Sequence, residues 1–205
     1  MRAIILLSGG ADSAVMLKMA LERGLECLAI SFDYGQRHVI ELSRAEKIAA
    51  FYNVEHKIIH IDKSAFAKSA LVGDGQDTYV PARNTLFLSF ALAQSEIWEA
   101  QEIHIGANRD DFAAYPDCRP EYFSAFGAVA RLGTKTGAKI AAPLASLTKG
   151  EVLEIGKRLR VPLEITWSCY DPQPGPTACG KCGACRLRTG MLPSGDHTPI
   201  KTKLP

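Results

Sequence analysis

Short apolar runs alternate with longer helix-like segments over the first 160 residues of the chain. The first run, residues 3–7, is continuous and stops just before the Ser-Gly-Gly turn, as expected of a buried parallel strand. Further strands are predicted at residues 26–32, 57–61, 101–106 and 139–142. Helices are predicted at residues 12–23, 42–52, 84–99, 121–132 and 149–159. This alternation predicts an α/β fold, a doubly wound and mostly parallel five-stranded sheet of the Rossmann-like kind.

The regular alternation stops near residue 160, and the remaining chain has a different character. Four of the six cysteines lie after this point. We expect residues 1–160 to form the α/β domain, residues 161–192 a cysteine-bearing segment packed on it, and residues 193–205 a tail. In such a sheet a ligand binds at the carboxyl ends of the strands, where the strand order reverses.

Composition and charge narrow the classes of function. The chain has 205 residues, 47% hydrophobic and 22% charged, which suffices for one ordinary domain with a real core. A net charge of +2 gives no case for binding nucleic acid. No apolar run approaches the ~20 residues of a membrane span, and the N-terminal run is too short for a signal peptide. We therefore expect a cytoplasmic protein, in which six cysteines favour metal binding or catalysis over disulfides.

The turn after the first strand, Ser8-Gly9-Gly10-Ala11-Asp12-Ser13, is a candidate phosphate site. Consecutive backbone N–H groups at such a turn form an anion-binding nest, and the following helix adds its positive N-terminal end. Both glycines permit positive φ angles and a close approach of the backbone, the serines offer hydroxyls, and Asp12 can cap the helix. The Gly-Lys-Ser/Thr ending of the Walker P-loop is missing, so a kinase-type site is not predicted. From the residues alone, nucleotide binding and a plain capped turn both stay open.

A second candidate site is the cysteine cluster near the C-terminus. Nine, two and two residues separate Cys169, Cys179, Cys182 and Cys185. Four thiolates without an open position indicate one structural zinc ion that clamps the C-terminal segment. An iron–sulfur cluster is the main alternative, because four cysteines also serve iron.

Several further motifs accompany these two sites. They are DYGQRH at residues 33–38, VPARNTLFL at 80–88, GANRDDFAAYPDCR at 106–119 and TWSCY at 166–170. The SGGADS turn resembles the loop of the pyrophosphate-loop ATPases, which adenylate a carbonyl oxygen and release pyrophosphate. With the other motifs and the cysteine run, residues 4–188 closely resemble the 7-cyano-7-deazaguanine synthase family within that superfamily.

The resemblance implies an ATP-dependent ligase that converts 7-carboxy-7-deazaguanine and ammonia into 7-cyano-7-deazaguanine, in queuosine biosynthesis. ATP would activate first the acid and then the amide as adenylates, with Mg²⁺ at its phosphates. The expected partners are these small molecules, and the family also implies a homodimer. Whether the products are AMP with pyrophosphate or ADP with phosphate stays open.

The matched motifs also imply roles for individual residues in ATP binding and catalysis. The ATP phosphates are assigned to Ser8, Gly9, Gly10, Asp12 and Ser13, and Asp12 is also a candidate contact for Mg²⁺. Arg83 and Lys149 join Asp12 as the expected catalytic set, since fixed cations there would offset developing charge. Arg37 and His38, after the second strand, are expected at the adenine and ribose. For His38, proton transfer and a structural hydrogen bond are the alternatives.

The substrate base needs a hydrogen-bonding edge and a flat apolar slot. A carboxylate from Asp111 or Asp117 would suit its guanine-like N1–H and amino groups, and Tyr115 would stack on the ring. Arg119 would pair with the substrate carboxylate as a bidentate fork.

Two other classes of function stay open from the sequence. One is another pyrophosphate-loop ligase or amidotransferase, either a relative that stops at the amide or a modifier of tRNA bases. The other is a zinc-stabilised nucleotide-binding module without catalysis. Pyrophosphate release that depends on the substrate separates these classes.

Overall fold

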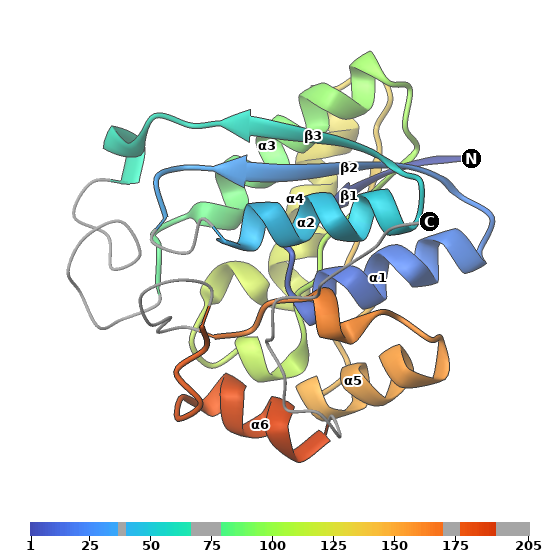
Figure 1. The fold of residues 1–205 in the computed structure, drawn as a ribbon. Coiled ribbons are helices and arrows are strands. Elements are labelled where there is room, and N and C mark those ends of the chain that lie inside the picture. The colour runs from blue at the N-terminus through green and yellow to red at the C-terminus, as the bar shows by residue number, and fades with distance from the viewer. Residues whose placement is uncertain (37–39, 67–78, 170–176, 192–205) are drawn as a thin grey trace.

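The structure is a computed structural model that describes residues 1–36, 40–66, 79–169 and 177–191. Its centre is a sheet of five parallel strands in the order β3-β2-β1-β4-β5 (Figure 1). The strands are β1 (Arg2–Leu6), β2 (Glu26–Asp33), β3 (Glu55–His60), β4 (Glu102–His104) and β5 (Lys139–Ala141). The prediction of a doubly wound α/β fold with a parallel five-stranded sheet is confirmed.

Helices cover both faces of this sheet (Figure 1). One face carries α1 (Ala11–Glu22), α2 (Ile40–Phe51) and α5 (Lys149–Arg158). The other carries α3 (Arg83–Ile97) and α4 (Pro120–Gly133). The helices α1, α2, α3 and α4 set their apolar positions against the sheet, and α5 packs on α1. Complete burial of one leucine or isoleucine in these contacts stabilises the fold by roughly 1.5–3 kcal/mol.

The middle strand, β1, is buried on both faces, which explains its continuous apolar sequence. Ile5 packs in the core beneath α1, and Ile4 packs in the core beneath α3. Ile4 also lies opposite Leu28 of β2 on one side and Ile103 of β4 on the other. The strand order therefore reverses between β1 and β4, and a crevice is expected at their carboxyl ends.

The chain after α5 packs back onto the domain. Val161, Leu163 and Ile165 are buried in the core that α1 and α5 share. Trp167, Cys169 and Cys185 form a small separate cluster, and α6 (Gly183–Met191) lies beside α5 (Figure 1). The sequence did not predict α6, and the division of the chain at residues 160 and 192 stays a prediction.

The predicted helices and strands of the α/β domain agree closely with the structure. Every one of these ten elements begins and ends within two residues of its predicted bounds. Of the helices in the described part of the chain, none is both long enough and apolar enough to cross a bilayer.

Candidate active site at the carboxyl edge of the sheet

A pocket of about 260 Å³ opens at the carboxyl ends of β1 and β4, where the strand order reverses. The first residues after β1, Leu7 and Ser8, form one wall, and Ile105, Gly106 and Ala107 after β4 form another. Eight of the residues predicted for the site line this pocket: Ser8, Gly10, Asp12, Ser13, Arg83, Asp111, Tyr115 and Lys149. The structure thus brings together residues that are up to 141 positions apart in the sequence.

The two glycines of the first turn have different tasks. Gly9 has φ +85°, and a β-carbon there would lie 2.2 Å from the Glu41 carbonyl oxygen, so only glycine fits beside α2. Gly10 is extended, with φ −80° and ψ 165°, and it is the N-cap of α1. Gly9 thus uses the positive φ angle that both glycines permit and Gly10 does not, and the N-cap is Gly10 rather than the candidate Asp12.

Hydroxyl groups hold the turn in one conformation. Ser13 Oγ donates to the Gly10 carbonyl oxygen at 3.0 Å and lies 3.1 Å from Ser8 Oγ. The backbone N–H groups of Ser8 and Gly10 donate to Ser13 Oγ and Ser8 Oγ, at 3.2 and 3.3 Å. The N-terminal end of α1 therefore meets the pocket in a fixed geometry, which is the arrangement that binds phosphate in other folds.

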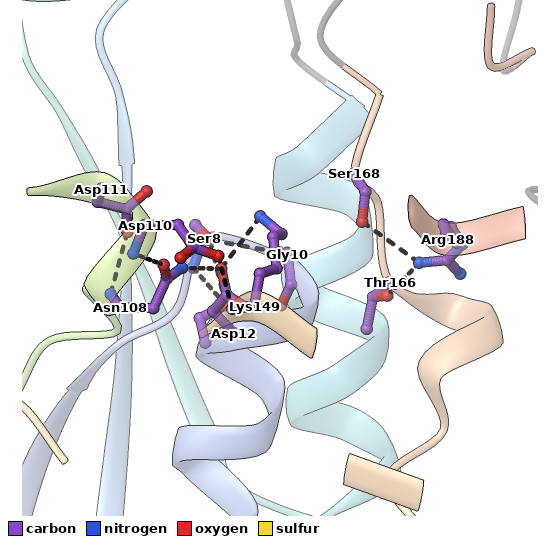
Figure 2. A network of polar contacts seen from close by, with 11 residues as sticks. Ser8, Gly10, Asp12, Asn108, Asp110, Asp111, Lys149, Thr166, Ser168 and Arg188 are labelled. Carbon is purple, nitrogen blue, oxygen red and sulfur yellow. Dashed lines mark hydrogen bonds and ion pairs between the residues drawn. The ribbon is translucent and has the colours of Figure 1, made fainter. Parts of the chain in front are cut away.

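A charged network joins three elements at the pocket floor (Figure 2). Asp12 Oδ2 of α1 lies 3.3 Å from Lys149 Nζ of α5 and accepts a hydrogen bond from Asn108 Nδ2 at 3.2 Å. Asp110 Oδ2 accepts from the Lys149 backbone N–H at 2.9 Å, and Asp111 Oδ2 accepts from the Asn108 N–H at 3.0 Å. Burial raises the pKa of the Asp111 carboxyl. The loop after β4 thus fixes Lys149 and Asp12 relative to each other.

The opposite wall of the pocket carries a second set of ionisable groups. Arg83 at the start of α3 faces Tyr34, Glu41 and Asp117. Burial lowers the pKa of Arg83, but these three groups together raise it by more, so the guanidinium stays charged. Burial also raises the pKa of Glu41 to about 7, although Arg83 and Lys149 oppose that shift. The pocket therefore places two fixed cations beside a carboxyl group that titrates near neutrality.

Several pocket residues were given no role from the sequence. Tyr34 lies in the DYGQRH motif but was not assigned a contact, and Glu41 was missed, although both follow β2 at the carboxyl edge of the sheet. Trp167 and Ser168 also line the pocket, and no local pattern places a segment from beyond α5 there.

Two of the predicted substrate contacts lie outside the set of residues that line the pocket. Asp117 Oδ2 accepts from the Asn84 N–H at 2.9 Å, so it satisfies the first turn of α3. Arg119 is exposed, and its Nε donates to the Phe112 carbonyl oxygen at 3.1 Å. Arg37 and His38 lie outside the described residues. Their roles stay predictions.

The four predicted metal ligands come together as one cluster. The sulfur atoms of Cys169, Cys179, Cys182 and Cys185 all lie within 4.8 Å of one another, and Cys179 Sγ is 3.9 Å from Cys185 Sγ. Zn–S bonds of about 2.3 Å in a tetrahedron require S···S separations of about 3.8 Å, so the donor set fits a single metal ion. The cluster is therefore a metal site by geometry and by donor chemistry.

Backbone N–H groups point at the sulfur atoms, as they do around metal-bound thiolates. Cys179 N–H donates to Cys169 Sγ at 3.2 Å, Cys182 N–H to Cys179 Sγ at 3.3 Å and Cys185 N–H to Cys182 Sγ at 3.4 Å. Backbone hydrogen bonds from Lys181 and Cys182 lower the pKa of Cys179 to about 7. Burial raises the pKa of Cys185, so that sulfur needs a cation to become a thiolate.

A protein-family model described as "Queuosine biosynthesis protein QueC" matches residues 2–194 of the chain. The chain belongs to this family. The 7-cyano-7-deazaguanine synthase of Thermoplasma volcanium is 46% identical to this QueC family member, and the match covers 98% of the chain and 90% of the relative. The enzyme of the same name from a Nostoc species is 47% identical, with 92% and 91% covered. The family predicted from the motifs is confirmed.

Solved structures with the same fold are more distant from the QueC chain. NMN synthetase from Francisella tularensis superposes with a TM-score of 0.55 at 20% identity, covering 99% of this chain and 89% of its own. The U34-tRNA thiolase NcsA from Methanococcus maripaludis, described with its [4Fe-4S] cluster, has a TM-score of 0.55 at 20% identity, covering 100% and 74%. At this identity the likeness is one of fold alone.

Proposed function

We propose that this protein is a 7-cyano-7-deazaguanine synthase, an ATP-dependent ligase that converts 7-carboxy-7-deazaguanine and ammonia into the nitrile. The observation that carries the proposal is the QueC family match over residues 2–194, together with relatives of that name that match nearly the whole chain. The pocket at the β1–β4 crevice supports it, because phosphate-binding and cationic groups converge there.

The chemistry explains why ATP is consumed. A carboxylate is an anion and a poor electrophile, so its oxygen attacks the α-phosphorus of ATP and pyrophosphate leaves. Ammonia then attacks the carbonyl carbon of the acyl adenylate, AMP leaves with the oxygen, and the amide remains after a proton is lost. A second ATP activates the amide oxygen in the same way, and elimination of AMP with loss of the second N–H proton gives the nitrile.

The phosphate contacts of this reaction are assigned to the first turn and the start of α1. Ser8, Gly10 and Ser13 line the pocket and would meet the phosphate oxygens, while Gly9 shapes the turn against α2. Lys149 and Arg83 stand on two sides of the same pocket as fixed positive charges. Charges held in place before the reaction stabilise the charge that develops on the phosphates without reorganisation.

The base is assigned to the wall formed by the loop after β4. Asp111 and Tyr115 line the pocket there and offer a carboxyl group and an aromatic ring. Phe87, which also lines the pocket, stacks on Phe32 with ring centroids 4.0 Å apart and extends this apolar side. A flat heterocycle with donor groups on its edge suits such a wall.

Two metal ions belong to the proposal. Zinc is the ion proposed for the four cysteines, since their close sulfur atoms suit one tetrahedral ion, whereas a four-iron cluster binds each cysteine to a different iron. Magnesium is proposed at Asp12, whose Oδ1 is buried and lacks a hydrogen-bond partner among the described residues. When bound with ATP, Mg²⁺ offsets the charge of the phosphate oxygens. Elemental analysis of the purified protein distinguishes zinc from iron at the four cysteines.

A homodimer is the proposed assembly. Ile97 and Leu132, at the ends of α3 and α4, are 72% and 90% exposed, and the neighbouring Lys135 N–H donates to the Glu96 carboxylate between those ends. A second copy would cover this apolar edge. Light scattering should give twice the mass of one chain, and the mass of a single chain would contradict the dimer.

The test is product formation by the purified protein with ATP, Mg²⁺, ammonia and 7-carboxy-7-deazaguanine, followed by mass spectrometry. We expect the nitrile. Lys149→Met should lower its rate by about 10²-fold, as loss of one electrostatic group does, whereas Lys157→Met on the exposed side of the same helix should not. Accumulation of the amide alone would indicate a relative that stops there, and an unchanged acid would contradict the proposed substrate.

A further inference from the structure

A buried cation links the metal segment to the pocket. Arg188 lies on α6, three residues after the metal ligand Cys185, and only 2% of its surface is exposed. Its Nη1 donates to Thr166 Oγ1 at 2.8 Å and to Ser168 Oγ at 3.4 Å (Figure 2). Its Nη2 donates to the Leu163 carbonyl oxygen. A guanidinium is expensive to bury, so several hydrogen bonds directed at one short segment indicate a specific task.

The segment that Arg188 binds forms part of the pocket. Trp167 and Ser168 line it, and the Trp167 N–H donates to the Gly9 carbonyl oxygen at 2.9 Å. The next residue of the turn, Gly10, also lies beside this segment, since a β-carbon there would be in van der Waals contact with the Trp167 carbonyl oxygen at 3.5 Å. The position of residues 166–168 therefore fixes one side of the turn assigned to the ATP phosphates.

The metal site holds the same segment from its other end. Cys169 follows Ser168 directly, and its carbonyl oxygen accepts a hydrogen bond from Trp167 Nε1 at 3.0 Å. Cys169 and Cys185 belong to one cluster of four cysteines, so a metal ion bound there would tie the segment to α6 at one point, and Arg188 ties it at a second. The Arg44 guanidinium of α2 lies over the Trp167 ring, 5.8 Å from its centroid.

We infer that Arg188 is a positioning residue for ATP: through Thr166 and Ser168 it holds Trp167 against Gly9, so that the metal-bound segment sets the geometry of the phosphate turn. The inference rests on the proposed function, because it takes ATP as the occupant of that turn. A clamp that served the C-terminal segment alone would need no hydrogen bond to the turn and no pocket residue in the clamped segment.

Tryptophan fluorescence measures ATP binding next to this contact. The chain has two tryptophans, and Trp98→Phe leaves Trp167 as the only reporter. In that background we expect Arg188→Gln to keep its metal, measured by elemental analysis, and to bind ATP with Mg²⁺ about tenfold more weakly, the effect of losing a charged hydrogen bond. The KM for ATP should rise by the same factor with little change in kcat. Arg186 is exposed on the same helix, and Arg186→Gln should change neither the affinity for ATP nor the KM for ATP.

A pair of variants at Thr166 gives a second test of the role of Arg188, which can be used if Arg188→Gln does not fold. Thr166→Val removes the acceptor of the Arg188 hydrogen bond and should weaken ATP binding, whereas Thr166→Ser keeps the hydroxyl and should restore it. Unchanged ATP binding in folded, metal-loaded Arg188→Gln or Thr166→Val would overturn the inference while the proposed function stands. A parent protein that neither binds ATP nor turns over would overturn both.

Discussion

A single ionisable side chain inside the pocket gives the stability of the protein one of its pH dependences. This side chain is Glu41, because burial raises its pKa to about 7. An ordinary glutamate has a pKa of 4.5, so the folded state favours the protonated carboxyl. The contribution of Glu41 to stability is therefore fully present below pH 4.5 and is lost as the pH rises through about 7.

Glu41→Gln should remove this loss. At about pH 8 we expect the variant to be more stable than the parent by on the order of 2 kcal/mol, and at about pH 4 the two should be equally stable. Urea unfolding without ATP measures both values. Glu46→Gln, exposed on the same helix, is the control and should show no such trend. A difference that does not depend on pH would mean that Glu41 titrates normally.

At the scale of elements, an ion pair between the half-exposed Arg23 and the buried Glu102 joins the end of α1 to β4. The two oxygens of Glu102 accept hydrogen bonds from Arg23 Nη1 and Nη2 at 3.0 and 2.9 Å. These bonds, with a contact to His104 Nε2 at 2.6 Å, lower the pKa of Glu102 to about 2. Burial lowers the pKa of His104, so its ring is neutral at neutral pH and the Arg23 fork supplies most of the stabilisation.

Glu102→Gln should therefore destabilise the protein by on the order of 2 kcal/mol at about pH 7. The stability that Glu102 contributes is present above its unfolded pKa of 4.5 and is lost as the pH falls through about 2, so the difference should shrink at about pH 3. Denaturant unfolding at the two pH values measures it. Glu99→Gln, whose pair with Arg2 is exposed, should cost less than about 0.5 kcal/mol. An equal cost of Glu102→Gln at both pH values would argue against the ion pair.

Elements with a strong local pattern were predictable from the sequence. Residues 3–7 of the first strand are a continuous apolar run, β2 is mostly apolar, and α5 opens with a Thr148–Glu151 capping box, so their positions follow from neighbouring residues. α6 was missed because it is short and because Gly183 and Gly190 weaken its helical pattern.

Residues whose task depends on a distant partner were not predictable in the same way. Gly9 is needed because α2 passes within 2.2 Å of where its β-carbon would be, and Asp117 binds the first turn of α3 rather than the pocket. Trp167 reaches the pocket only because α6 and the metal ligands hold its segment there. The neighbouring sequence does not indicate the roles of such residues, because the contact that explains each of them forms only in the folded chain.

At the scale of the whole molecule, the metal segment and the sheet should differ in stability. The cluster of Trp167, Cys169 and Cys185 is separate from the two large cores on either side of the sheet. Removal of the metal with a chelator should therefore increase amide hydrogen exchange in α6 by about tenfold or more, while β1 and β2 stay protected. Added zinc should restore the protection. Equal loss of protection in β1 and α6 would mean that the metal holds the entire fold.

The central claim is that this pocket activates a carboxyl oxygen at the α-phosphate of ATP, and oxygen labelling tests it most directly. 7-Carboxy-7-deazaguanine with ¹⁸O in both carboxyl positions is converted with unlabelled ATP and ammonia. The masses of the nitrile, AMP and phosphate products are then measured by mass spectrometry. We predict two molecules of AMP for each nitrile, each carrying one ¹⁸O, because each activation moves one oxygen from the substrate to AMP. Label in inorganic phosphate, or AMP without label, would contradict the claim.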